Sequence, residues 1–245
     1  MLHAAGIPLP GGIHVHGYWQ MDDRKVSKSL GNLIDPLAMR ERYGFAPFRY
    51  FLLREMSFGL DGTFSEEAMI ERANAHLSNA LGNLLSRTLN MTDRYCDGAV
   101  PAPDATGEAE ETVRRAASEA ALAVDRHLLA FEPHLALEAL FRLVDATNRY
   151  VDRGEPWKAA KDPAREGEVR TTLYTCCQAL RAIALLLGPF LPDAAETMLE
   201  RLGAAGALAT ADLPADAAAW DALAPGTPTT KGASLFPRLE RVVDE

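Results

Sequence analysis

The chain has 245 residues, of which 48% are hydrophobic, and a net charge of −9. These values are typical of a globular protein with one or two domains and a sizeable core. The longest apolar run, Ala182–Leu187, is far too short to span a bilayer, and no secretory signal follows Met1. The three cysteines form no CxxC pair and no Cys/His cluster. We therefore expect a cytoplasmic protein with no membrane partner and no metal site in this chain.

The acidic charge is concentrated in the second part of the chain. Residues 1–64 contain 7 of the 25 basic and 6 of the 34 acidic residues, so their net charge is +1 and that of the remainder is −10. This balance is compatible with an ordinary acidic protein. If the acidic part binds nucleic acid, the contact must come from a local patch.

The first twenty residues are rich in glycine and proline and predict a small β-element. Ile13–His16 alternates apolar and polar residues as a short strand does, and Tyr18–Met21 is a second candidate strand. Together they would present the loop at 24–29. His14 and His16 could form a metal pair, but no third ligand is nearby, which favours a structural role on the strand.

That loop, Arg24–Asn32, places Arg24, Lys25 and Lys28 within five residues. Ser27 and Ser29 alternate with the lysines, and Gly31-Asn32 is a turn signal. Ammonium and hydroxyl groups at this density can bind phosphate oxygens. The stretch is not a P-loop, because no G-x-x-x-x-G-K precedes it. A solvated basic turn is the alternative interpretation.

The rest of the chain predicts a series of helices, so the expected fold is mainly α, with a short β-element followed by an α-helical bundle. Asp35-Pro36, Ser65, Pro133 and Pro192 are typical helix starts. Apolar residues then recur every three or four positions. The expected helices cover 36–43, 47–56, a long segment from Ser65 to about Tyr95, 108–130, 133 to about 152, 165–187 and 192–202. The alanine-rich segment 203–219 is weakly specified, and Leu235–Arg238 is expected to fold back onto the body.

The long helix also carries a polar stripe. Its members are spaced four, three and four residues apart and therefore lie on one side: Asn83, Arg87, Asn90 and Arg94. Amides and guanidiniums without carboxylates are unusual on so acidic a chain.

The loop Arg24–Asn32 resembles the KMSKS signature of class I aminoacyl-tRNA synthetases, with Val26 at the usual Met position. Its flanks make the resemblance narrower: His16–Trp19 before it, and Asn32–Pro36, Arg49–Glu55 and Phe58–Ser65 after it. This succession is similar to bacterial methionyl-tRNA synthetases, from just before the loop to the end of their helical core. The resemblance covers nearly the whole chain.

The resemblance implies ATP-dependent activation of methionine and its transfer to tRNA(Met), with ATP and Mg²⁺ as the family's cofactors. The motif lysines Lys25 and Lys28 would be catalytic, with Lys28 the one in direct phosphate contact. Lys25, Ser27, Lys28 and Ser29 would together bind ATP. Negative charge accumulates on the departing pyrophosphate, and preorganised cations stabilise it. Val26 would anchor the loop by packing.

The positions that match the family's anticodon readers are Asn83, Arg87 and Trp157. Asn83 and Arg87 lie one helical turn apart and can hydrogen-bond base edges. Trp157 offers a flat face to an unstacked base, and Pro156 fixes the backbone before it. The alternative for Trp157 is a core tryptophan that closes a helix end.

The resemblance divides the chain into residues 1–64, the end of a catalytic region, and residues 65–245, an anticodon-binding domain. The family's HIGH motif has no counterpart here, so we expect the chain alone to be inactive. DNA is not an expected partner. The rival hypotheses are a non-catalytic helical tRNA-binding module acting in trans, the equivalent part of another class I synthetase, and a plain helical scaffold.

Overall fold

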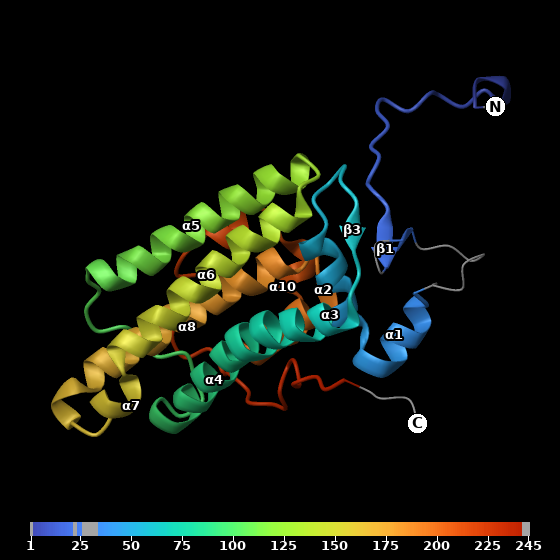
Figure 1. Ribbon diagram of the computed structural model, residues 1–245. Helices are drawn as coiled ribbons and strands as arrows, with labels where there is room; N and C mark the ends of the chain where they lie inside the picture. The colour runs from blue at the N-terminus through green and yellow to red at the C-terminus, as the bar shows by residue number, and fades with distance from the viewer. Residues whose placement is uncertain (1, 22–23, 26–33, 242–245) are drawn as a thin grey trace.

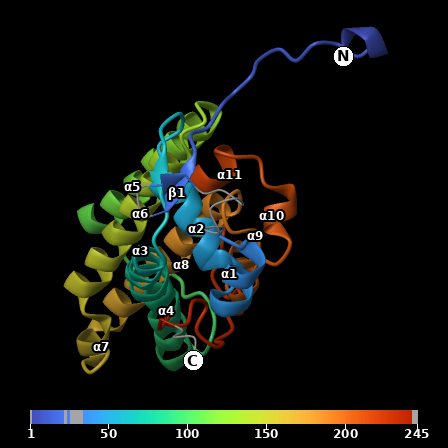
Figure 2. The same ribbon diagram turned by 45° about the vertical axis from the view of Figure 1, so that its right-hand side comes forward.

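A computed structural model of the chain describes residues 2–21, 24–25 and 34–241. A body of long helices forms most of the molecule, and a small sheet lies at one end of it (Figure 1). The segment before the sheet extends away from the body in both views (Figures 1 and 2). The predicted fold class, a short β-element followed by an α-helical bundle, is confirmed.

The sheet has three very short strands, β1 (Trp19–Met21), β2 (Arg24–Lys25) and β3 (Gly62–Thr63), in the order β2-β1-β3. β1 is antiparallel to β2 and parallel to β3. The Asp61 carboxylate joins β3 to β1, because it accepts hydrogen bonds from the Tyr18 backbone N–H at 2.7 Å and from Gln20 Nε2 at 2.9 Å. The Asp61 side chain therefore ties the loop before β3 to the strand that leads to the basic loop.

The strand predicted at Ile13–His16 is wrong. The segment between η1 (His3–Ala5) and β1 forms no ladder, and the side chains of Ile13 and Val15 are 82% and 71% exposed. Alternation predicts a strand only where a neighbouring strand and a buried face exist, and this segment has neither. His14 instead stacks on the ring of Phe131, with 3.9 Å between the ring centroids.

Two short helices follow, α1 (Pro36–Tyr43) and α2 (Phe45–Glu55). The predicted start of α1 is confirmed, since the Asp35 side chain caps it by accepting from Leu37 N at 2.9 Å. Gly44 separates the two helices with φ +82°, in the region that favours glycine. Arg49 donates to the backbone carbonyls of Pro189 and Phe190, so this side chain fastens α2 to the helical body.

The long predicted helix is present but is not uniformly α-helical. It consists of α3 (Glu66–Arg72), the π-helix η3 (Ala73–Gly82) and α4 (Asn83–Tyr95). Ser65 caps its start, as predicted, by accepting from Ala68 N. Nothing in the apolar spacing indicated the π-helix, a form frequently found at functional sites.

The remaining helices pack around α8, which is buried along most of its length. Figure 1 shows the long helices α5, α6 and α8 running side by side in the body. Four helices of the body have bounds close to the predicted ones: α5 (Glu108–Leu129), α6 (Pro133–Gly154), α8 (Glu166–Leu187) and α9 (Pro192–Arg201). The short helices α7 (Pro156–Ala159) and η4 (Pro163–Arg165), between α6 and α8, were not predicted. The alanine-rich segment holds only the short helices α10 (Ala207–Thr210) and α11 (Ala215–Ala218).

The segment after α11 folds back onto the body, as predicted for Leu235–Arg238, and there it contacts the π-helix. Asn74 binds both backbone groups of Leu239, and Ser78 Oγ donates to the carbonyl of Pro237 at 3.2 Å. Phe236 is buried in the main core. Across the part of the chain that the structure describes, no helix combines the length and apolar content needed to cross a membrane.

Candidate functional site

The basic loop begins at the sheet. Lys25 is the last residue of β2, and its backbone pairs with Gln20 of β1. Three of the predicted ATP-binding residues, Ser27, Lys28 and Ser29, lie outside the described residues. The loop therefore starts at the end of β2, which pairs with β1. Asp61, the residue before β3, is hydrogen-bonded to Tyr18 and Gln20 at β1.

The second candidate site lies where α4 crosses α6. Arg87 of α4 donates from Nη1 to Asp152 Oδ1 at 2.6 Å, and from Nη2 to Asn148 Oδ1 at 2.8 Å and to the Asn148 carbonyl at 3.2 Å. Asn148 and Asp152 are four residues apart and so occupy one face of α6. A guanidinium is a rigid planar fork, and contacts at both of its ends fix its plane.

The π-helix takes part in this arrangement. Asn148 Nδ2 donates to the carbonyl of Ala80, which lies in η3, at 3.3 Å. A single amide therefore joins the π-helix to the guanidinium of Arg87. The Arg87 Nε atom is buried and has no hydrogen-bond partner among the described residues, so α6 holds this side chain through its two Nη atoms.

The other members of the polar stripe are more exposed than Arg87. Asn83 is exposed one turn before it, and Asn90 donates to Ser86 Oγ at 3.3 Å. Arg94 lies over the ring of its neighbour Tyr95, with its guanidinium carbon 5.4 Å from the ring centroid. The stripe thus presents one tightly held cation between exposed amides.

Trp157 lies just beyond the end of α6. Glu155, with φ +43°, turns the chain there, and Pro156 is buried at the start of α7. The Trp157 side chain is 38% exposed, so it is not one of the buried core aromatics. Because Asp152 holds Arg87 five residues earlier on the chain, Arg87 and Trp157 are attached to the same end of α6.

Sequence reasoning missed Asn148 and Asp152. The spacing of four was visible, but it identifies only a face of a helix. Which face of α6 is covered by α4 depends on tertiary packing. Asp152 is one of many acidic residues in this part of the chain, so its charge alone did not single it out as the partner of Arg87.

The described residues offer no activated nucleophile among the thiols. Burial raises the pKa of Cys96 to about 11 and that of Cys177 to about 12, and burial raises the pKa of Cys176 as well. All three cysteines are free thiols and remain protonated near neutral pH. Within 2–21, 24–25 and 34–241, no group of three or more His, Cys, Asp or Glu is placed to hold a metal ion.

Comparison with known proteins first defines the class. Residues 1–89 match the family model "tRNA synthetases class I (M)", which includes the basic loop. Residues 100–244 match the model "Anticodon binding domain of methionyl tRNA ligase". The chain therefore belongs to the methionyl-tRNA ligase family, as the resemblance implied.

The relatives found by sequence and by structure agree with this assignment. The chain is 40% identical to a methionine–tRNA ligase of Caldanaerobacter subterraneus subsp. tengcongensis over 98% of its own length and 37% of the relative's. It is 41% identical to a methionine–tRNA ligase of Bacillus subtilis, over 98% of the chain and 36% of that relative. Mycobacterium tuberculosis methionyl-tRNA synthetase bound by methionyl-adenylate superposes with a TM-score of 0.87 at 38% identity, over 96% of this chain and 46% of that one. The chain thus spans less than half the length of these relatives.

Proposed function

We propose that this chain supplies two parts of a methionine–tRNA ligase: the pyrophosphate-stabilising loop and the anticodon reader. The reaction is ATP-dependent activation of methionine followed by transfer to tRNA(Met). Support for the activation step comes from the relative in M. tuberculosis, whose structure holds methionyl-adenylate. ATP, used with Mg²⁺, supplies the α-phosphate that becomes part of the adenylate.

The loop residues act on charge. Lys25 and Lys28 are assigned to the phosphate oxygens, and Ser27 and Ser29 position the loop and add hydroxyl donors. An ammonium group placed where negative charge develops lowers the barrier without reorganising during the step. Lys25 is the last residue of β2, so the pairing of β2 with β1 sets the position of the backbone where the loop begins.

The helical face acts on bases. The observation that carries this proposal is the double hold of Asn148 and Asp152 on Arg87, which fixes the plane of a guanidinium beside an exposed Asn83. Discrimination between bases depends on donors held in one geometry, because a base edge offers a fixed pattern of acceptors. Trp157 adds an exposed aromatic face for stacking.

We further assign residues 1–64 to the end of the catalytic region and residues 65–245 to the anticodon-binding domain. Two apolar clusters support this division. The smaller one gathers around Phe51 and Phe64 and also includes Met69 and Ile70 of α3, and the larger one fills the helical body. Tyr50 of α2 belongs to the larger cluster, so the two parts share a packed boundary.

The test is a titration of the chain with an anticodon stem-loop that carries CAU and with one whose anticodon is changed, at one fixed salt concentration. The proposal expects preferential binding of the CAU loop. Arg87→Ala should relax this preference at one anticodon position more than it lowers overall affinity. Equal binding of all loops by the wild-type chain would remove the assignment to anticodon reading.

A further inference from the structure

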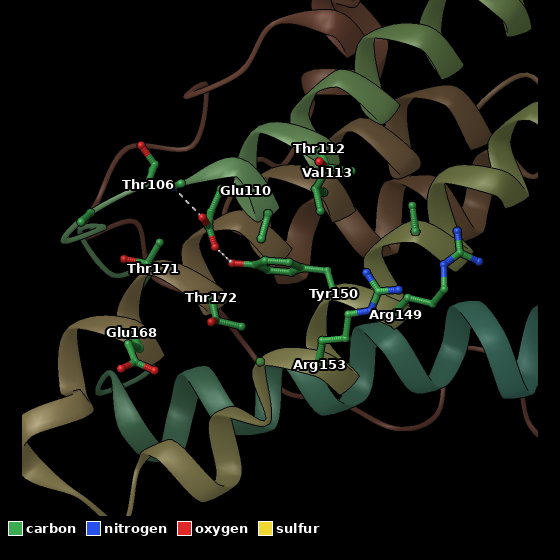
Figure 3. A pocket seen from close by; sticks show the side chains of 15 residues that line it. Thr106, Glu110, Thr112, Val113, Arg149, Tyr150, Arg153, Glu168, Thr171 and Thr172 are labelled. Carbon is green, nitrogen blue, oxygen red and sulfur yellow. Dashed lines mark hydrogen bonds between the residues drawn. The ribbon is translucent and has the colours of Figure 1, made fainter.

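A cavity of about 600 Å³ lies on the side of α6 next to the Arg87 contact. It is open to solvent and is lined by the start of α5, the second half of α6 and the first turns of α8 (Figure 3). From α6 it receives Arg149, Tyr150 and Arg153. Nothing in the base-reading face makes use of this cavity.

Two arginines of α6, Arg149 and Arg153, line it. Arg149 and Arg153 are exposed and four residues apart, so they form one row on α6, with Cβ atoms about 5–6 Å apart. Within the described ranges, neither guanidinium has a hydrogen-bond or ion-pair partner. Arg142, two turns earlier on the same helix, instead pairs with Glu138 at 3.1 Å. Free guanidiniums are unexpected in a region whose net charge is −10.

The carboxylates of the cavity are already bound by other groups. Glu110 accepts from the Tyr150 hydroxyl at 2.6 Å and from the Gly107 N–H at 2.7 Å, and Glu168 pairs with Arg165 at 2.7 Å. Burial acts to raise the pKa of Glu110, but the hydrogen bonds from Tyr150 and Gly107 outweigh it and lower that pKa. Figure 3 shows Glu110 pointing to the tyrosine hydroxyl, while the two arginine side chains occupy the space beside the ring. The arginine donors therefore remain available to an anion from outside.

The row is adjacent to the residues that hold Arg87. Arg149 follows Asn148, and Arg153 follows Asp152, so each arginine is turned by about 100° around α6 from a contact of Arg87. Gly154, which also lines the cavity, is three residues before Trp157. The row therefore lies at the same end of α6 as the residues assigned to base reading, Arg87 and Trp157.

We propose that Arg149 and Arg153 bind successive phosphates of the anticodon-loop backbone. The proposal rests on the function proposed above and adds a positioning contact to it. Arginine matches the geometry of phosphate oxygens with its planar fork. Phosphate contacts fix the register of an RNA strand but carry no sequence information. The two faces of α6 would thus have different roles. Asn148 and Asp152 on one face position Arg87 for base recognition, and Arg149 and Arg153 on the other bind the RNA backbone.

The experiment compares Arg149→Gln, Arg153→Gln and the double variant with the control Arg142→Gln, which makes the same charge change on the same helix away from the cavity. Each is titrated with the CAU stem-loop and with a loop of changed anticodon, at four salt concentrations. We expect each of the first two variants to lose about fivefold in affinity for both loops alike. The salt dependence should become shallower by about 0.7 in log–log slope for each arginine removed.

The control should retain the wild-type affinity and the wild-type slope. The opposite outcome is that Arg149→Gln and Arg153→Gln behave like Arg142→Gln while the wild-type chain still prefers CAU. That result would contradict phosphate binding by Arg149 and Arg153 and would leave the proposed anticodon recognition intact. A loss of preference for CAU without a change of slope would also overturn the proposal, because it indicates base contact. If the wild-type chain does not prefer CAU, the proposed function itself fails, whatever the variants do.

Discussion

Residues up to β3 and the helical body that follows differ in how deeply their side chains are buried. Before β1 the chain has no ladder, and even Ile13 and Val15 are mostly exposed. In the helical body, α8 is buried almost throughout. The helices α4, α5, α6 and α9 pack against it. The difference matches two tasks: the first part carries a short basic loop that acts on charge, whereas the body holds donors in fixed geometry for recognition.

The largest expected effect concerns the loop. In the context of a full-length ligase, Lys28→Ala should lower the rate of methionine activation by a factor of about 10²–10³, about 3–4 kcal/mol, because it removes a cation that stabilises transition-state charge. Methionine binding should change far less. Methionine-dependent ATP–pyrophosphate exchange measures both quantities. An unchanged exchange rate would take Lys28 out of the catalytic role.

The body should respond to loss of packing instead. Leu180 of α8 is completely buried, so Leu180→Ala should lower the free energy of unfolding by about 3 kcal/mol through lost transfer energy and a residual cavity. Urea denaturation followed by circular dichroism gives the value. Leu122→Ala is the control, because Leu122 is 64% exposed on α5 and should cost little. Similar losses in both variants would contradict the assignment of α8 as the centre of the core.

The exposed aromatic should matter for binding and little for stability. Trp157→Ala should weaken binding of the CAU stem-loop by about 1–3 kcal/mol, the usual worth of a base–aromatic stack. Trp157→Phe should lose less, since a π-face remains. Unfolding midpoints of both variants, measured alongside the titrations, separate the two roles. A variant that loses stability but keeps its affinity would make Trp157 a structural residue.

The smallest effect is expected within the first part, at the start of α1. Asp35 caps α1 through its bond to Leu37 N, so Asp35→Ala should cost about 1 kcal/mol. The loss should be confined to α1, because few contacts link that helix to the main core. Hydrogen exchange can localise it. Faster exchange spread through α5, α6 and α8 would show that the two parts are more tightly coupled than we infer.

Local signals were sufficient for much of the fold. Asp35-Pro36, Ser65, Pro133 and Pro192 located four helix starts, because capping chemistry depends on neighbouring residues alone. Ile13–His16 failed for the opposite reason, since a strand requires a partner elsewhere in the chain.

The candidate site was only partly predictable. The stripe containing Asn83 and Arg87 followed from helical spacing, and the anticodon assignment followed from family resemblance. The hold of Asn148 and Asp152 on Arg87, the π-helix before Asn83 and the unpaired row on α6 depend on how α4, α5 and α6 pack. No single-helix pattern encodes such packing.

The central claim, that Trp157 and Arg87 read anticodon bases, has a direct optical test. The chain contains 3 tryptophans, so Trp19→Phe with Trp220→Phe leaves Trp157 as the only one. Stacking of a base on its exposed face should quench its fluorescence when the CAU stem-loop is added. We expect saturable quenching by the CAU loop, with a much weaker response to a loop of changed anticodon and a loss of this difference in Arg87→Ala. Equal quenching by both loops, or binding with no change in Trp157 emission, would contradict the account.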